Sequence, residues 1–169
     1  MGNFDNRLPW SNTAHVWTKS EGSPSADGRY WGFMAETEDF APLGFFVYNM
    51  ETDTIASTLT NRARPDHVSM SASGNYFVVS WDAPDGTWAY PRDLQTRFQL
   101  HASSEHSDLA LDANGDDIYV SVDYGSNGGD VFMVNLRTRA RTTLFPTYCD
   151  IASEFDIDAY VIQLAPDAF

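Results

Sequence analysis

Apolar and polar residues alternate in short runs along this chain, and the runs come in groups that repeat. In the clearest group, Val68 and Met70 precede a polar turn, and Tyr76 and Val78 continue the alternation after it. A period of two is typical of β-strands that have one buried face. No stretch longer than a turn or two shows the period of a helix. The pattern therefore predicts an all-β protein made of antiparallel strands.

The turn that joins these two strands occurs three times. The copies are Ser-Ala-Asp-Gly, Ala-Ser-Gly-Asn and Ala-Asn-Gly-Asp, and they contain Gly28, Gly74 and Gly115. Gly and Asn tolerate the positive φ that tight hairpin turns require. A third and a fourth strand are predicted after each turn, for example at residues 44–48 and 54–59. A unit of about 40–45 residues with several strands is typical of a β-propeller blade.

The repeats predict a single β-propeller domain over residues 1–169. We expect about three four-stranded antiparallel blades, at approximately residues 22–60, 65–100 and 105–146. Two flanking segments also alternate. Residues 14–18 are expected to form the outer strand of a preceding blade, and residues 157–164 the inner strand of a following one. Because closed propellers have about 4–8 blades, the chain is expected to be an incomplete propeller, a fragment of a longer one, or one that closes as a homo-oligomer.

The first half of each repeat resembles the TolB-type, tryptophan-aspartate-like propeller repeats. The usual phrase of that class is Ser-Pro-Asp-Gly followed by an apolar strand. The first copy here is Ser23-Pro24-Ser25-Ala26-Asp27-Gly28, with an insertion, and the other two copies lack the proline. The resemblance covers roughly residues 22–145. It implies a propeller fold and leaves the function open, because propellers serve as enzymes, receptors and scaffolds.

Acidic residues dominate the charge of the chain. Asp and Glu number 24 against 10 Lys and Arg, which gives a net charge of −14. Such a surface repels phosphate backbones, so nucleic acid is not an expected partner. The balance is typical of salt-adapted proteins, and an acidic extracellular or periplasmic protein is the alternative. No apolar run is long enough to cross a membrane, and the N-terminus does not resemble a signal peptide. We therefore expect a soluble protein with no membrane partner.

Candidate site residues gather where the first strand of each blade begins and in the loop between its second and third strands. These two places share one face in this class of propeller. The candidate ligand-binding residues are Trp81, Asp82, Tyr90, Arg92 and Tyr124, and the candidate metal ligands are His67, His106 and Asp108. Aromatic rings can stack on sugars, and an arginine can clamp a carboxylate. Imidazoles beside carboxylates can bind Mn²⁺, Ca²⁺ or Zn²⁺. The structural alternative is that these histidines hydrogen-bond neighbouring groups within the blade.

Two further segments could take part in binding. Asp112-Ala-Asn114-Gly-Asp116 resembles the start of a calcium loop, but it lacks the glycine at the sixth position and the glutamate at the twelfth. We predict an ordinary turn there. The stretch Val122–Asp130 is rich in glycine and predicts a flexible loop that places Tyr124 over a ligand.

The layout of the candidate site is loosely similar to oligogalacturonate-lyase-type propellers. By that resemblance His67 and His106 would bind a metal ion and Arg92 would steady a uronate, with the base unassigned. The resemblance implies a ligand-binding propeller that is carbohydrate-active, with metal-assisted, lyase-like chemistry. The alternative is a non-catalytic propeller that binds another protein, or a fragment of a larger propeller protein. No Ser-His-Asp, Cys-His or HExxH arrangement is present to indicate another enzyme class.

Overall fold

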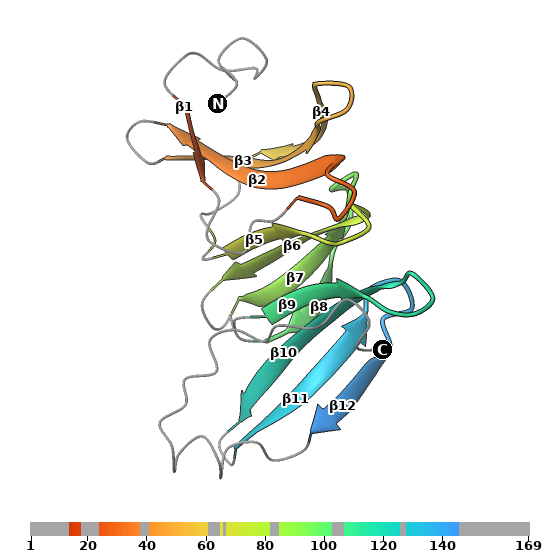
Figure 1. Cartoon of the computed structure of the whole chain (residues 1–169). Coiled ribbons are helices and arrows are strands. Elements are labelled where there is room, and N and C mark those ends of the chain that lie inside the picture. The colour runs from red at the N-terminus through yellow and green to blue at the C-terminus, as the bar shows by residue number, and fades with distance from the viewer. Residues whose placement is uncertain are drawn as a thin grey trace.

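The fold consists of β-strands throughout the part of the chain that the structure describes. The computed structural model describes residues 14–17, 24–37, 41–60, 65, 67–81, 85–102, 107–125 and 128–145. These residues form 12 strands and no helix, arranged as three four-stranded antiparallel sheets (Figure 1). The prediction of an all-β, antiparallel protein is confirmed. A helix of the length and apolarity needed to cross a membrane is absent from these residues.

Each sheet is a meander in which strands that follow one another in sequence pair with one another. Sheet A contains β1 (Ala14–Trp17), β2 (Tyr30–Thr37), β3 (Pro42–Asn49) and β4 (Thr54–Thr60). Sheet B contains β5 (His67–Met70), β6 (Tyr76–Trp81), β7 (Gly86–Pro91) and β8 (Phe98–His101). Sheet C contains β9 (Ser107–Leu111), β10 (Asp117–Gly125), β11 (Gly128–Asn135) and β12 (Arg141–Phe145). Figure 1 shows the three sheets stacked in chain order, with sheet B in the middle.

The position of β1 differs from the sequence prediction. The sequence predicts an outer strand of a preceding blade at residues 14–18, but β1 is the first strand of sheet A and pairs antiparallel with β2. The residues directly before the first turn, 19–24, contain no alternating apolar residues. The apolar segment further upstream, β1, therefore pairs with the edge of β2. The other flanking segment, residues 157–164, lies outside the described residues.

The glycine has the same conformation and hydrogen bond in all three repeated turns. Gly28, Gly74 and Gly115 have φ of 69°, 74° and 78°, and each donates its N–H to the carbonyl oxygen three residues earlier. In the third turn, the Asp112 carboxylate accepts hydrogen bonds of 2.8 Å from the backbone N–H groups of Asn114 and Asp116. Asp112 therefore stabilises the turn, in agreement with the predicted turn.

Sheets A and B pack through a large apolar cluster. Met34, Phe45 and Val47 of sheet A meet a set of side chains from sheet B: Val68, Met70, Phe77, Val79, Tyr90 and Leu94. The two sheets approach closely at Gly32, where an added Cβ would lie 2.3 Å from the ring of Phe77. A glycine is required here because the Phe77 ring already occupies the space that a side chain would need.

Sheets B and C pack in the same manner. Their cluster contains Val78, Ala89 and Leu100 from sheet B and the side chains of Tyr119, Phe132, Val134 and Leu136 from sheet C. The outward faces of the two end sheets are also apolar. Phe33 and Phe46 belong to such a cluster in sheet A, and Val120 and Val131 to one in sheet C. Each sheet therefore has two apolar faces, as expected for a repeated unit that packs on both sides.

The glycine-rich stretch Val122–Asp130 is not a loop, and this corrects the sequence prediction. β10 continues to Gly125 and β11 begins at Gly128, with Val122 opposite Val131 and Tyr124 opposite Gly129. The stretch extends the β10–β11 hairpin because the ladder that starts at Ile118 and Asn135 continues without interruption. Only residues 126 and 127 of this stretch lie outside the described residues.

Candidate functional site

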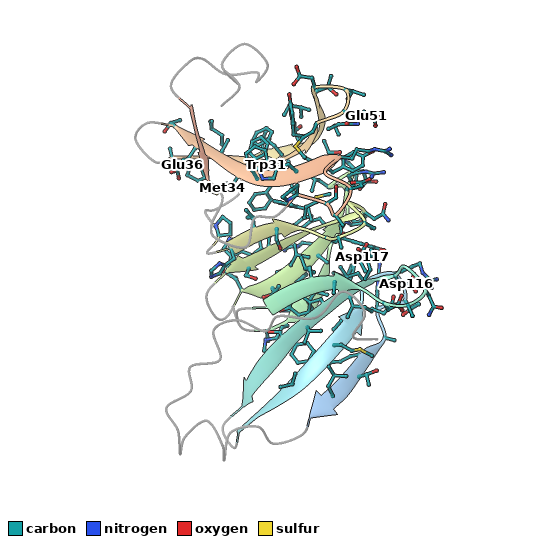
Figure 2. The ribbon with its side chains drawn as sticks, viewed as in Figure 1. Trp31, Met34, Glu36, Glu51, Asp116 and Asp117 are labelled. Atoms are coloured by element: carbon teal, nitrogen blue, oxygen red, sulfur yellow. The ribbon has the colours of Figure 1, made fainter. Side chains whose placement is uncertain are left out.

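Each sheet has two ends, and the candidate residues are divided between them. We call the end that carries the repeated turns the turn end, and the opposite end, where β5 begins at His67 and β6 finishes at Trp81, the loop end. Figure 2 shows Glu36 of β2 at the loop end, and Asp116 and Asp117 beside the third turn at the other end. The sequence predicts that the candidate residues share one face of the propeller. That face corresponds to the loop end of the sheets.

Trp81 and His67 lie at the loop end of sheet B, on opposite faces. Trp81 packs on Phe45 of sheet A with 5.8 Å between the ring centroids, and its side chain remains partly exposed. His67 precedes Val68, whose side chain faces sheet A, so the alternation along β5 places His67 on the face toward sheet C. The two residues therefore share an end of the sheet but do not converge.

Tyr90 lies inside the core between sheets A and B. Its side chain is 1% exposed and its ring meets that of Phe45 edge-on, 6.1 Å away. The Tyr90 hydroxyl accepts a hydrogen bond of 3.3 Å from Arg97. In this arrangement the ring stabilises the packing of the two sheets and has no face open to a sugar.

Arg92 lies at the turn end, away from Trp81 and His67. Its backbone N–H donates to Asn75, and its guanidinium donates to the Gly74 carbonyl oxygen at 3.2 Å and covers the Tyr30 ring at 4.1 Å. Arg92 therefore joins the second turn to sheet A. The sequence could not separate it from Tyr90 and Trp81, because the direction of β7 decides which end each residue reaches.

The candidates of sheet C are described only through their backbone positions. Tyr124 lies opposite Gly129, near the tip of the β10–β11 hairpin at the loop end. Asp108 lies opposite Val120 in β10. Asp82 and His106 lie outside the described residues.

The described residues do not assemble the predicted metal set. Val120 belongs to the apolar cluster on the face of sheet C that points away from sheet B, so the register position of Asp108 is on the far side of sheet C from His67. No group of three or more His, Cys, Asp or Glu side chains within the described ranges could hold a metal ion. Because His106 is outside those ranges, the three-residue set stays a prediction.

A row of polar side chains crosses sheet B at its loop end. His67 lies opposite Ser80, Ser80 opposite Thr87, and Thr87 opposite His101. The His101 ring stacks on Phe132 of sheet C at 5.1 Å and 24°, so this row faces sheet C. Ser80 Oγ and Thr87 Oγ1 share a hydrogen bond of 3.0 Å. Ser80, Thr87 and His101 are buried, and His67 is half-buried at the start of the row.

The corresponding row of sheet A is entirely apolar in its residue types. Met34 and Ser80 are both the sixth residue after their turn glycine. In sheet A, Trp17 lies opposite Met34, Met34 opposite Phe45, and Phe45 opposite Leu59. Four apolar residues in one sheet are thus replaced by four polar residues in the next. Since sheet A packs on sheet B without polar residues in its row, the fold does not require them in sheet B.

Ser80, Thr87 and His101 are not among the site residues that the sequence predicts. A signal was present, because the sixth residue after the turn glycine is Met34 in the first repeat but Ser80 and Ser121 in the second and third. The remaining pairs depend on strand register. A bulge between Thr87 and Trp88 moves His101 opposite Thr87, and no sequence pattern predicts that bulge.

The turn end carries the strongest described ion pair. Arg137 makes two hydrogen bonds of 2.6 Å to the Asp116 carboxylate, and Asn135 donates a third at 3.1 Å. The hydrogen bonds from Arg137 and then Asn135 lower the pKa of Asp116 from 3.8 to about 2. The pair joins the third turn to the β11–β12 turn of the same sheet, so its role is structural.

We expect the contribution of Asp116 to stability to depend on pH below pH 4. Because its pKa is lower in the folded state, the stabilisation is fully present above the ordinary carboxyl pKa and is lost as the pH falls through about 2. Urea unfolding of the wild type and of Asp116→Asn between pH 5 and pH 2 checks this. The stability difference between the two proteins should shrink as the pH falls. A difference that stays constant over this range would contradict the assignment.

Comparison with known proteins gives weak structural similarities. No protein-family model and no curated protein matches the chain. An oligogalacturonate lyase in complex with manganese superimposes at TM-score 0.45 and 10% identity, over 78% of this chain and 40% of that one. Kuenenia stuttgartiensis hydrazine synthase gives TM-score 0.40 and 10% identity, over 72% and 36%. A eukaryotic initiation factor gives 0.43 and 14%, over 82% and 36%. The chain thus spans two fifths or less of these proteins, and none of these similarities decides its fold or function.

Proposed function

We propose that this chain is a ligand-binding module made of β-propeller blades, and that it binds an uncharged saccharide at the loop end of sheets B and C. The propeller assignment is supported by the packing of the sheets. Sheet A packs on sheet B as sheet B packs on sheet C, and in all three turns the glycine N–H donates to the carbonyl oxygen three residues earlier. Successive four-stranded meanders stacked face to face are the building units of propellers.

The polar row of sheet B is the observation that supports binding. Buried polar side chains cost free energy unless they are hydrogen-bonded, and sheet A is built with an apolar row at the same place. A polar row that packing does not require is expected to serve another purpose. Hydroxyl and imidazole groups donate and accept hydrogen bonds without a fixed charge, which suits the hydroxyl groups of a sugar.

Two further features favour an uncharged sugar over a uronate. The net charge of −14 disfavours an anionic ligand. The position of Arg92 at the turn end separates it from His67 and Trp81. Half-buried His67 is the member of the row that a ligand reaches first. The proposal concerns binding alone, since no residue is assigned as a catalytic base.

A panel of neutral oligosaccharides and oligogalacturonates, titrated by calorimetry, tests the proposal. We expect a neutral oligosaccharide to bind and the His67→Ala variant to bind it at least tenfold more weakly, a loss of about 1.4 kcal/mol. Arg92→Ala is the matched control, since it removes a predicted site residue from the other end of the same sheet and should leave the affinity unchanged.

Other outcomes would overturn parts of the proposal. Binding of the oligogalacturonate that depends on Arg92 would restore the uronate site that the resemblance implies. Failure of the whole panel to bind the folded wild type would reject the saccharide. The protein-binding alternative would then be the function to test.

A further inference from the structure

The last strand of sheet A, β4, differs from every other edge strand that the structure describes. The edge strands of the three described sheets are β1 and β4, β5 and β8, and β9 and β12. β4 has seven residues, whereas each of the other five has four or five. β4 also contains no ionisable side chain. Each of the others contains one, and these residues are His15, His67, His101, Asp108 and Arg141.

The composition and exposure of β4 favour pairing with a further strand. Four of its seven residues are β-branched, namely Thr54, Ile55, Thr58 and Thr60, and the strand contains neither Pro nor Gly. β-Branched residues favour the extended backbone of a sheet. Exposed side chains alternate with half-buried ones along the whole strand. Figure 1 shows β4 at the edge of sheet A opposite β1, and among the described strands β4 pairs with β3 alone. A long edge of this kind is a template for another strand.

The last strands of the other two sheets, β8 and β12, are protected by arginine. Arg97 is exposed directly before β8, and exposed Arg141 begins β12. Charged side chains on an edge strand oppose pairing with another chain. A bulge can also protect an edge, but β4, β8 and β12 all have an irregularity in their pairing. In β4 this irregularity lies at Ala56 and leaves residues 57–60 in regular pairing with β3. Length and absence of charge therefore distinguish β4.

The charges of the chain favour a second copy of it as the partner of β4. Two molecules that each carry a net charge of −14 repel each other, and the repulsion is least where the contact itself is uncharged. A charged peptide would find no opposite charge on β4, whereas a second β4 is uncharged as well. The turn before β4 carries the exposed acids Glu51 and Asp53, and Figure 2 shows Glu51 there. Parallel pairing would set these acids beside those of the partner, but antiparallel pairing separates them by the length of the strand.

We propose that two copies of this chain pair through β4, antiparallel about a two-fold axis, so that their two A sheets form one eight-stranded sheet. Threonines that face each other across such a contact contribute packing and hydrogen bonds. One pair of strands buries less surface than the roughly 1,600 Å² of a standard interface, so we expect a weak dimer that dissociates on dilution. This contact differs from closure of the propeller through its end sheets, and it does not depend on saccharide binding.

Sedimentation velocity of the full chain over about a hundredfold range of concentration tests the proposal, with Thr58→Lys as the test variant. Thr58 is exposed in the regular part of β4, so lysine adds a charge to the edge without disturbing the core. We expect the wild type to dimerise reversibly and Thr58→Lys to dimerise at least tenfold more weakly. The wild-type dimer should be stronger in 1 M NaCl than in 0.1 M NaCl, because salt screens the repulsion between two acidic molecules. Hydrogen exchange of the concentrated wild type should show added protection in β4.

Thr142→Lys is the matched control. It makes the same substitution at an exposed threonine of β12, the last strand of sheet C, and changes the net charge equally, so this variant should dimerise as the wild type does. Equal dimerisation of the wild type and Thr58→Lys would overturn the proposal, since the contact would then lie elsewhere, for example at the end sheets. A wild type that stays monomeric at every concentration in 1 M NaCl would also overturn it.

Discussion

Replacement of Phe45 by alanine is expected to reduce the free energy of unfolding by about 3–5 kcal/mol, the usual loss when a large core side chain is removed. Phe45 is 0% exposed and lies at the centre of the packing between sheets A and B. Its ring centroid is 5.6 Å from that of Phe77, 5.8 Å from Trp81 and 6.1 Å from Tyr90. The cavity would be lined by these three rings of sheet B and by the neighbouring side chains of sheet A, Met34 and Val47, so the surroundings can close it only if the sheets move. Urea unfolding followed by tryptophan fluorescence measures the loss.

Phe98→Ala is the control for this prediction. Phe98 is half-buried in β8, where its ring meets Tyr76 edge-on and lies under the Arg139 guanidinium. Because the site is open to solvent on one side, water can fill the space and the loss should be clearly smaller. A loss at Phe45 no greater than that at Phe98 would mean that sheets A and B are not packed through this cluster in solution.

The strands and turns could be predicted from the sequence because their signals are local. The alternation around Val68 and Val78 places two strands, and Gly74 marks the turn between them, where its φ of 74° confirms the need for glycine. The sequence predicts the wrong blade for β1 for the opposite reason. Its partner, β2, begins 13 residues after β1 ends, and the choice between partners on either side depends on tertiary packing.

The candidate site was predicted less well because it depends on strand direction and register. Tyr90 and Arg92 are close to Trp81 in sequence, yet β7 runs from the loop end to the turn end and carries them away from it. The polar row joins four strands through three separate registers. Single residues such as Ser80 carry no chemical signal by themselves, and they gain meaning only when the repeats are compared position by position.

Replacement of Asp117 by alanine is expected to reduce the free energy of unfolding by about 2–4 kcal/mol. Hydrogen bonds to charged groups contribute about 1.5–3 kcal/mol each, and a donor that loses its acceptor adds a desolvation penalty. Asp117 begins β10 of sheet C and accepts hydrogen bonds from Ser73 in the turn of sheet B, 2.9 Å from its backbone N–H and 2.5 Å from its hydroxyl. Burial, and then the charge of Asp117, raise the pKa of the neighbouring Tyr76 hydroxyl. The alanine variant would leave the N–H of half-buried Ser73 without its acceptor.

Neighbouring Asp116 provides the matched control, since it is the same residue type and hydrogen-bonds Arg137 within its own sheet. Asp116→Ala should cost less, because water can replace the exposed guanidinium contact. The stability loss of Asp117→Asn should fall between those of the two alanine variants, since the asparagine side-chain oxygen can still accept from the Ser73 N–H.

A double-mutant cycle with Ser73→Ala separates the contact from other effects of the substitution. Additive losses in that cycle would show that Asp117 acts within sheet C alone. A coupling of 1 kcal/mol or more, within the range of about 0.5–3 kcal/mol found for directly interacting residues, would show that this buried acid joins the second sheet to the third.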